Sequence, residues 1–478
     1  MTIGSLFEQS IAAAFPHEFT PHQREAVSAI GSFLADPRND QAFVLRGYAG
    51  TGKTSLVSAV VRVWRKLQRP VVLLAPTGRA AKVFSLHAGL PAHTIHRVIY
   101  RQKSFEGEDT QFDRGWNNAK SALFIVDEAS MISGDTGEMT PFGSGNLLDD
   151  LLSYVWSADE AKLIFVGDTA QLPPVGTPLS DALNAEVLTS RYGLHVYGME
   201  LREVVRQKRG GILHNATQLR ELLDEYADED PEEILPIHLE TEGWQGIFPV
   251  EGGTFIETLD EAYRKYGEEE CLVICPSNKL ALECNHAIRS SVLFYEEEPV
   301  VRGERLIVAR NNYHYTKRPD RSDFIANGEI IEVQRIGRHY YEYGLHFADA
   351  TIYLPDRDDS LEVRLLLTSL EDPTPQRSQA ERQRLFELIA ADYADIPSVT
   401  DRRKAIRRDP FWGALEVKYG YAVTAHKAQG GQWACVFVDL SFVGYLPEDR
   451  NLVRWIYTAI TRATKRVYLL GYPAGLVD

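Results

Sequence analysis

Short apolar runs alternate with helical stretches over the first two hundred residues of the chain. Four of these runs are typical of parallel strands buried on both faces of a sheet, and they span residues 42–45, 71–75, 122–126 and 163–166. Helical sequence lies between them, for example at residues 54–67 and 79–86. Strands and helices that alternate in this way predict an α/β domain with a doubly wound parallel sheet.

A second α/β alternation begins near residue 272 and is interrupted by a long segment of different character. Its expected strands lie at residues 272–275, 421–424, 436–440 and 467–470, and its first helix lies near 278–293. Within the interruption, residues 328–367 follow the two-residue rhythm of antiparallel strands, and charged helical sequence follows at 376–408. We therefore predict a second α/β domain that carries a small β-barrel-like insert.

The composition excludes several classes of protein. It is 44% hydrophobic and 25% charged, with no apolar run near the roughly 20 residues that span a bilayer. Residues 1–15 lack a basic segment and contain Glu8, unlike a secretory signal. Four cysteines are too few for a disulfide scaffold, and no second Cys/His pair lies near enough to favour a metal site. We expect a cytoplasmic protein without a membrane partner.

The net charge of −16 argues against a protein that coats nucleic acid nonspecifically. It does not exclude a local basic surface, because salt screens charges beyond about 10 Å. A basic run of Arg402, Arg403, Lys404, Arg407 and Arg408 offers one such surface. Net charge alone therefore argues neither for nor against binding of nucleic acid.

A phosphate-binding loop is predicted directly after the first strand. Residues 47–54 read Gly-Tyr-Ala-Gly-Thr-Gly-Lys-Thr, which fits G-x-x-x-x-G-K-T in its expected place between a strand and a helix. Glycines let backbone N–H groups converge on phosphate oxygens beside the positive end of the helix. The loop supplies the candidate nucleotide ligands Gly50, Thr51, Gly52, Lys53 and Thr54.

An acidic pair at the end of the 122–126 strand completes a nucleoside triphosphatase site. Asp127 is placed to hold Mg²⁺ together with the Thr54 hydroxyl, and Glu128 to polarise the attacking water. The pattern predicts hydrolysis of ATP or GTP. No Asn-Lys-x-Asp segment occupies a suitable place, which disfavours guanine.

Further segments resemble superfamily 1 helicases, most closely the RecD-like and Dda-like branch. The resemblance runs from about residue 19 to 471, and its most diagnostic segment, residues 167–175, reads Gly-Asp-Thr-Ala-Gln-Leu-Pro-Pro-Val. Other matching segments read Phe-Thr-Pro-His-Gln at 19–23, Ala-Pro-Thr-Gly-Arg-Ala-Ala at 75–81, Thr-Ala-His-Lys-Ala-Gln-Gly at 424–430 and Tyr-Thr-Ala-Ile-Thr-Arg-Ala at 457–463.

The resemblance implies roles for residues on both α/β domains. The implied catalytic set is Lys53, Asp127, Glu128, Gln171 as a γ-phosphate sensor, Arg206 as a further γ-phosphate contact, and Arg462 as an arginine finger. Gln23 would read the adenine edge, and Gly430 would lie toward ATP. The implied nucleic-acid contacts are Thr77, Gly78, Thr94, His96, Asn278, Thr424 and His426.

Local alternatives stay open at several of these positions. Gln23 alone fits a surface helix residue, and Thr77 fits a helix N-cap. Thr94 and His96 fit an ordinary surface turn, while Asn278 fits a cap of its own helix.

The resemblance also implies a domain plan of two RecA-like P-loop NTPase cores. Core 1A would comprise residues 1–92 and 120–208, with a strand-separating hairpin insert at 93–119. Core 2A would comprise 209–304 and 416–478, with an SH3-like barrel and helical extension at 305–415. The expected ligands are ATP and Mg²⁺, and the expected partners are single-stranded DNA and junctions between single and double strands. We expect a monomer.

The predicted function is ATP-dependent DNA unwinding with translocation from 5′ to 3′. The direction rests on the branch resemblance alone. An RNA helicase of the same superfamily, an ATP-switched binding module without turnover, and a structural protein with a relic loop remain alternatives. A role in replication, repair or recombination is left open.

Overall fold

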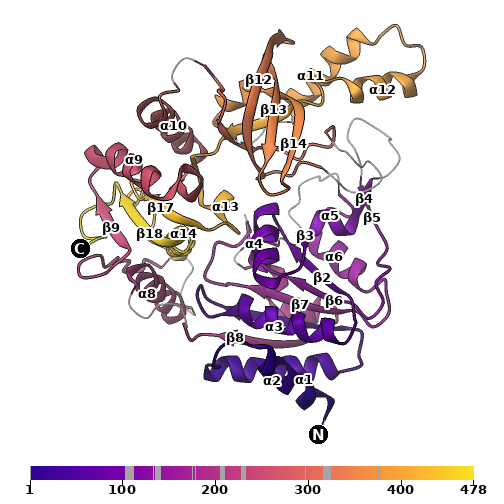
Figure 1. Ribbon diagram of the computed structural model, residues 1–478, viewed down its shortest axis with the longest axis vertical. Coiled ribbons are helices and arrows are strands. Elements are labelled where there is room, and N and C mark those ends of the chain that lie inside the picture. The colour runs from indigo at the N-terminus through magenta and orange to yellow at the C-terminus, as the bar shows by residue number, and fades with distance from the viewer. Residues whose placement is uncertain are drawn as a thin grey trace.

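The structure is a computed structural model that describes most of the 478 residues. The described residues are 2–102, 112–132, 134, 142–174, 176–177, 179–204, 210–227, 233–295, 298–315, 324–374, 377 and 379–478. Figure 1 shows two α/β cores side by side, with a β-barrel above them.

The first core is built on a six-stranded sheet in which every neighbouring pair of strands is parallel. Its order is β3-β2-β6-β7-β1-β8. The strands are β1 (Gln41–Gly47), β2 (Val71–Ala75), β3 (Ala92–Thr94), β6 (Leu123–Val126), β7 (Lys162–Gly167) and β8 (His195–Leu201). The four apolar runs expected from the sequence are β1, β2, β6 and β7, so the doubly wound parallel sheet is confirmed.

Helices cover both faces of this sheet because its central strands are buried on both sides. Phe43 and Leu45 of β1 pack with one helical layer, whereas Ala42 and Val44 pack with the other. The first layer holds α1 (Ile3–Ala14), α2 (Pro21–Ala35), α3 (Lys53–Lys66) and α4 (Gly78–Ala88). The second holds α5 (Ile95–Ile99), α6 (Leu147–Val155) and α7 (Ala185–Ser190).

A two-stranded ribbon of β4 (Tyr100–Gln102) and β5 (Phe112–Arg114) projects from the first core. It lies in the segment predicted to be a hairpin insert, whose tip falls outside the described residues. Phe112 of β5 stacks on Phe142 and packs against Tyr313, with ring centroids 4.6 Å apart in the second pair. The ribbon is thereby tied to the chain that leads into the barrel.

The second core has a five-stranded parallel sheet in the order β16-β10-β17-β18-β9. Its strands are β9 (Ile247–Val250), β10 (Cys271–Cys275), β16 (Ala422–Thr424), β17 (Trp433–Asp439) and β18 (Ala463–Leu470). Its helices are α8 (Gly211–Glu225), α9 (Phe255–Tyr266), α10 (Asn278–Ile288), α13 (Ala425–Ala428) and α14 (Arg450–Ile460). The expected helix at 278–293 ends earlier as an α-helix, and Arg289–Leu293 forms a π-helical turn.

A closed barrel of five strands stands between β10 and β16 in the chain. Its strands are β11 (Arg305–Val308), β12 (Ile330–Glu342), β13 (Leu345–Leu354), β14 (Asp359–Leu366) and β15 (Leu415–Tyr419). Tyr343 and Gly344 both have positive φ, as a two-residue hairpin turn requires, and they join β12 to β13. The predicted barrel is confirmed, and its last strand extends to Tyr419.

The helical sequence at 376–408 forms two helices and not one. They are α11 (Gln379–Asp392) and α12 (Val399–Arg408), which project beside the barrel (Figure 1). Pro397 cannot donate a backbone hydrogen bond, and the Ser398 hydroxyl caps α12 by accepting from the N–H of Asp401. These two residues separate the helices. None of the helices that the structure describes is long and apolar enough to cross a membrane.

A buried ion pair joins the second core to the barrel. Arg289 lies 3.0 Å from Glu304, both side chains are almost fully buried, and Glu304 also accepts from the Tyr421 hydroxyl. Arg289→Met should destabilise this part of the fold by about 3–5 kcal/mol, because the Glu304 carboxylate would remain buried without its cation. Urea unfolding followed by tryptophan fluorescence measures the change. Arg264→Met is the control, since its ion pair with Asp260 is exposed and contributes less than about 1 kcal/mol.

Candidate nucleotide and nucleic-acid site

The predicted phosphate loop lies between β1 and α3, on the side of the first core that contacts the second. Gly50 and Gly52 have φ values of +79° and +84°, which side chains rarely adopt. A Cβ on Gly52 would lie 2.7 Å from Nε2 of Gln23, so glycine is required there for space as well. Lys53 Nζ donates to the carbonyls of Gly47 and Tyr48 at 2.6 and 2.9 Å. The loop is therefore shaped for phosphate, with its cation folded onto its own backbone.

Gln23 supports this loop from α2. Its Nε2 donates to the carbonyl of Thr51 at 2.9 Å, while its Oε1 accepts from the N–H of Thr20 in a capping box. Gln23 is buried and not a solvated helix residue, so that local alternative is wrong. An amide has two donors and two acceptor sites, so one of each remains for an adenine edge. Adenine recognition by Gln23 stays a prediction.

The acidic pair follows β6 at the carboxyl edge of the sheet. Glu128 has φ +52° and ψ +39°, an uncommon left-handed conformation for a residue with a side chain, and it precedes a 3₁₀ turn at Ala129–Met131. Asp127 Oδ1 accepts from the backbone N–H of Glu128. Burial and the adjacent Glu128 carboxylate raise the pKa of Asp127 to about 7. A cation bound beside Asp127 would favour the ionised form of its carboxyl group.

The residues that would hold Mg²⁺ have the chemistry that this ion prefers. Thr54 supplies a hydroxyl at the start of α3, and Asp127 supplies a carboxylate at the end of β6. Mg²⁺ takes hard oxygen ligands and commonly needs only one or two from the protein, the rest coming from phosphates and water. The donor set therefore fits Mg²⁺ bound with a triphosphate.

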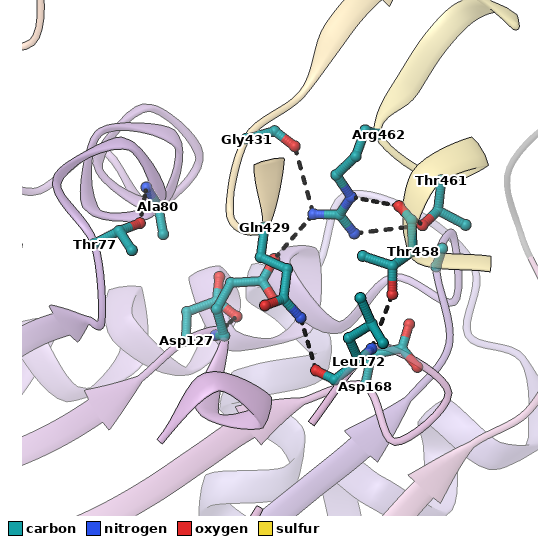
Figure 2. A network of polar contacts seen from close by, with 12 residues as sticks. Thr77, Ala80, Asp127, Asp168, Leu172, Gln429, Gly431, Thr458, Thr461 and Arg462 are labelled. Carbon is teal, nitrogen blue, oxygen red and sulfur yellow. Dashed lines mark hydrogen bonds and ion pairs between the residues drawn. The ribbon is translucent and has the colours of Figure 1, made fainter. Parts of the chain in front are cut away.

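The segment after β7 places Gln171 next to Leu172, which contacts the second core. Gln171 is 6% exposed, and its Oε1 is buried without a hydrogen-bond partner among the described residues. An unsatisfied buried polar atom costs about 1–3 kcal/mol, so the Gln171 oxygen would gain from a further hydrogen-bond donor. Leu172 is held from the second core at both backbone groups. Its N–H donates to Thr458 Oγ1 at 2.8 Å, and its carbonyl accepts from Gln429 Nε2 at 2.7 Å (Figure 2).

Arg462 reaches the first core from the end of α14. Its guanidinium Nη1 lies 4.0 Å from Oε1 of Glu128, and Figure 2 shows Arg462 among Gly431, Thr458 and Thr461. Its Nε donates to the carbonyl of Thr458 at 3.0 Å, which fixes the side chain along the helix end. The side chain is only 5% exposed. A buried cation from one core therefore faces the carboxylate of the other.

Tyr457 makes a second contact between the cores that the sequence did not predict. Its hydroxyl donates to Asp168 Oδ2 at 2.7 Å and accepts from the N–H of Ala49, in the phosphate loop, at 2.9 Å. Tyr457 and Asp168 are both 1% exposed. One hydroxyl thus joins the phosphate loop, the segment after β7 and α14. Both residues lie in segments singled out in the sequence, but only their juxtaposition reveals this role.

The phosphate loop also contacts the first helix of the second core. The Tyr48 hydroxyl donates to the carboxylate of Asp224 at 3.1 Å, and the Arg220 guanidinium lies 4.4 Å from the centre of the Tyr48 ring. Asp224 and Arg220 belong to α8. Two consecutive loop residues, Tyr48 and Ala49, are therefore both held by the second core.

Threonines expected to touch nucleic acid stand at helix N-termini. Thr77 Oγ1 accepts from the N–H of Ala80, and Thr94 Oγ1 accepts from the N–H of Arg97. Both are N-caps, as the local alternative held for Thr77, and this does not exclude contact with a phosphate at the same helix end. Thr424 occupies the N-cap position of α13 without a side-chain cap bond. Gly78 has open space where a side chain would project.

The remaining predicted contacts have different surroundings. His96 packs against Tyr100 and Phe142, and burial lowers its pKa to about 4, so the ring is neutral near pH 7. His426 is exposed. Asn278 is the first residue of α10, but Ser277 caps that helix, so the cap suggested for Asn278 is wrong. Arg206 lies outside the described residues, and its role stays a prediction.

Gly430 lies closer to the expected nucleic-acid residues than its predicted role suggests. A Cβ there would meet Ala80 Cβ at 2.8 Å and Thr77 Oγ1 at 3.1 Å. Nearby, the Arg79 guanidinium stacks 3.8 Å from the centre of the Trp433 ring. The α4 end of the first core therefore packs directly on the turn before β17 of the second. The contact of Gly430 with ATP stays a prediction.

The fold and this site define a two-core protein with a P-loop. Comparison with known proteins shows which families the chain is similar to. The family model of an AAA domain matches residues 18–235, and that of a UvrD-like helicase C-terminal domain matches residues 419–470.

Two helicases are among the relatives. The ATP-dependent RecD2 DNA helicase of Deinococcus radiodurans is 33% identical over 441 aligned positions, covering 90% of this chain and 46% of that protein. The ATP-dependent DNA helicase dda of Enterobacteria phage T4 is 23% identical, covering 94% of this chain and 99% of that protein. A solved Bacteroides Pif1 helicase in complex with ADP-AlF3 and ssDNA is 14% identical with a TM-score of 0.46, covering 97% of this chain and 95% of that one.

The chain is similar to superfamily 1 helicases of the RecD-like and Dda-like branch over most of its length, which supports the resemblance expected from its sequence. It spans less than half the length of the Deinococcus protein, and 36% of the length of a relative from Methanocaldococcus jannaschii.

The Tyr457 bridge generates a prediction that needs no enzymatic assay. Tyr457→Phe should make the amides of the phosphate loop exchange with deuterium about fivefold faster, because Ala49 loses an acceptor worth about 1 kcal/mol. Hydrogen exchange of the peptide that contains residues 47–54 measures the change. The control is Tyr445→Phe, whose hydroxyl is on an 87% exposed side chain. Equal exchange in Tyr457→Phe and the wild type would show that the bridge does not hold the loop.

Proposed function

We propose that the protein is an ATP-dependent DNA helicase that moves 5′ to 3′ on single-stranded DNA and unwinds duplex DNA. The observation that carries the proposal is the approach of Arg462 from the second core to Glu128 of the first, at 4.0 Å. The two groups that hydrolysis needs, an activating carboxylate and a charge-neutralising guanidinium, thus meet only when the cores are together.

The first core would bind the triphosphate. Lys53 would exchange its bonds to the carbonyls of Gly47 and Tyr48 for bonds to phosphate oxygens, and the loop amides would complete the cradle. Thr54 and Asp127 would hold Mg²⁺, which neutralises charge on the β- and γ-phosphate oxygens. Gln171 would orient the attacking water near the γ-phosphate with its buried oxygen, which has no hydrogen-bond partner in the part of the chain that the structure describes.

Hydrolysis would require a rearrangement of the Glu128–Arg462 pair. Glu128 accepts a proton from the attacking water, so its carboxylate must be released from the guanidinium. Arg462 would then turn to the transferred phosphoryl group, an effect worth roughly 10³–10⁵ in rate in related enzymes. Glu128 and Arg462 can separate easily, because they are 4.0 Å apart and are not joined by a short hydrogen bond. Both side chains nevertheless remain close to the place that the γ-phosphate would occupy.

Movement along DNA would follow from coupling of the two cores. The first core offers Thr77 and Thr94, and the second offers Thr424, His426 and Asn278, as contacts to the phosphate backbone. Gly430 packs on Thr77, so the two sets meet at the junction that ATP binding would close. A change in core spacing would then alter the distance between the two grips on the strand.

Similarity to known helicases supports the proposal that the substrate is DNA and that movement is 5′ to 3′. Both named relatives are DNA helicases, and one of them is matched over 99% of its length. An RNA-directed helicase would share every residue of the ATP site, so the substrate is decided by measurement. The predicted hairpin tip at residues 103–111 and Arg206 belong to the proposal, although they lie outside the described residues. We also propose that the protein acts as a monomer.

Glu128→Gln tests turnover. The substitution keeps the shape of the side chain but removes the base, so hydrolysis should fall by at least about 10²-fold while ATP binding persists. ATPase rates and titration with a fluorescent ATP analogue measure the two effects. Glu257→Gln, on exposed α9, is the matched control. A binding module without turnover predicts no difference between Glu128→Gln and the wild type.

Duplexes with one single-stranded tail test the reaction itself. We expect ATP-dependent strand displacement from a 5′ DNA tail and little from a 3′ tail, and stronger ATPase stimulation by poly-dT than by poly-U. Preference for poly-U would favour the RNA alternative, and displacement from the 3′ tail alone would reverse the direction. No displacement from either tail, with ATPase indifferent to nucleic acid, would refute the helicase proposal.

A further inference from the structure

A basic surface lies on α12, a helix that is distant in the sequence from the phosphate loop and the acidic pair. Arg403, Lys404, Arg407 and Arg408 recur at helical spacing, so they share one face of this helix. Arg403, Lys404 and Arg408 are exposed. Asp401 pairs with Lys404 at 3.4 Å in an exposed ion pair, and the buried Asp409 caps the end of the helix. Four cations on one face contrast with the net charge of −16 of the whole chain.

The opposite face of α12 fixes the helix to the protein. Ile406 is buried against Leu385 and Ile389 of α11. The Arg402 guanidinium donates to the carbonyl of Ile396 at 2.9 Å, so this arginine is used to hold the preceding turn. The basic face is therefore presented on an anchored helix, with its direction set by packing.

The C-terminal end of α12 lies close to the ribbon that projects from the first core. His314 Nδ1 lies 3.0 Å from the carbonyl oxygen of Arg407. The preceding residue, Tyr313, packs on Phe112 of β5 with ring centroids 4.6 Å apart. Two adjacent residues thus connect α12 to the base of the proposed strand-separating hairpin. A duplex that reached this hairpin would arrive beside the basic face.

We propose that the basic face of α12 binds the phosphate backbone of duplex DNA ahead of the junction. This inference rests on the proposed helicase function and adds a second DNA surface to it. Arg and Lys side chains on a helix bind backbone phosphates without reading sequence. Such a contact would hold the duplex against the hairpin while the two cores draw one strand away.

The chemistry of the face favours a duplex over a single strand. Surfaces for single strands combine basic residues with aromatic rings on which bases stack. The sequence of α12, Val-Thr-Asp-Arg-Arg-Lys-Ala-Ile-Arg-Arg, contains no aromatic residue. A duplex presents one phosphate charge per roughly 1.7 Å of its axis and no accessible base faces, so a purely cationic face suits it better.

The test compares DNA binding by the 478-residue chain and by its Arg403→Gln/Arg408→Gln variant. Fluorescence anisotropy is measured over a salt series with a blunt duplex, the same duplex with a 5′ tail, and the tail alone. Removal of two phosphate contacts should weaken binding of the tailed duplex by roughly tenfold or more near 0.1 M salt. It should also reduce the slope of log affinity against log salt by about 2. Affinity for the tail alone should be unchanged.

Two further variants separate charge at this place from charge in general. Arg65→Gln/Lys66→Gln removes the same charge from exposed residues at the far end of α3, about 20 Å along the helix from Lys53, and should leave all three affinities unchanged. Arg403→Lys/Arg408→Lys should retain most of the affinity for the tailed duplex.

The proposal is overturned if Arg403→Gln/Arg408→Gln binds the tailed duplex like the wild type. An equal loss on the tail alone would also overturn it, since the face would then hold the single strand. Binding of none of the three DNAs by the wild type would instead refute the helicase function. The wild-type titration therefore separates the two failures.

Discussion

The arrangement of the site depends on one buried hydrogen-bonded bridge between the two cores. The Tyr457 hydroxyl is shared by Ala49 of the phosphate loop and by Asp168 after β7. A hydroxyl can donate once and accept as well, so one atom satisfies a carboxylate and an amide at the same time. Burial raises the pKa of Tyr457 well above its ordinary value. The Tyr457 hydroxyl therefore keeps its proton at any physiological pH and remains a donor to Asp168. The bridge therefore depends on how the cores are placed and not on pH.

This bridge explains how a phosphate loop in one core can influence the other. Tyr48 and Ala49 are both held by helices of the second core, α8 and α14. Arg462 lies five residues after Tyr457, just past the end of α14, and Thr458 between them accepts from the N–H of Leu172. The neighbouring Gln171 has an oxygen with no hydrogen-bond partner among the described residues. Any movement of the loop as it takes up phosphate must shift α14. Since the contacts are packed and directional, the response is a change between arrangements and not a gradual deformation.

The sequence predicted those parts of the fold whose burial is complete. β1, β2, β6 and β7 are central strands, so their apolar runs stand out. β3, β8 and β9 are edge strands with half-exposed residues, and no apolar run marked them. The break between α11 and α12 was missed because charged residues continue on both sides of Pro397. The loop, the acidic pair and Arg462 could be named because local sequence carries their chemistry. Tyr457, Asp224 and Arg220 could not, because their partners lie some 170 to 410 residues away.

The strained conformation of Glu128 is held by contacts within the first core. A left-handed backbone at a residue with a side chain costs about 1–3 kcal/mol and persists only where its surroundings fix it. Here Asp127 accepts from the Glu128 amide, and the 3₁₀ turn that follows is held by Ser180, whose hydroxyl donates to the carbonyl of Ala129. The backbone is therefore committed before any nucleotide binds, and the Glu128 side chain is left where Arg462 arrives. A rigid carboxylate on one core and a helix-anchored guanidinium on the other leave the spacing of the cores as the variable that ATP can change.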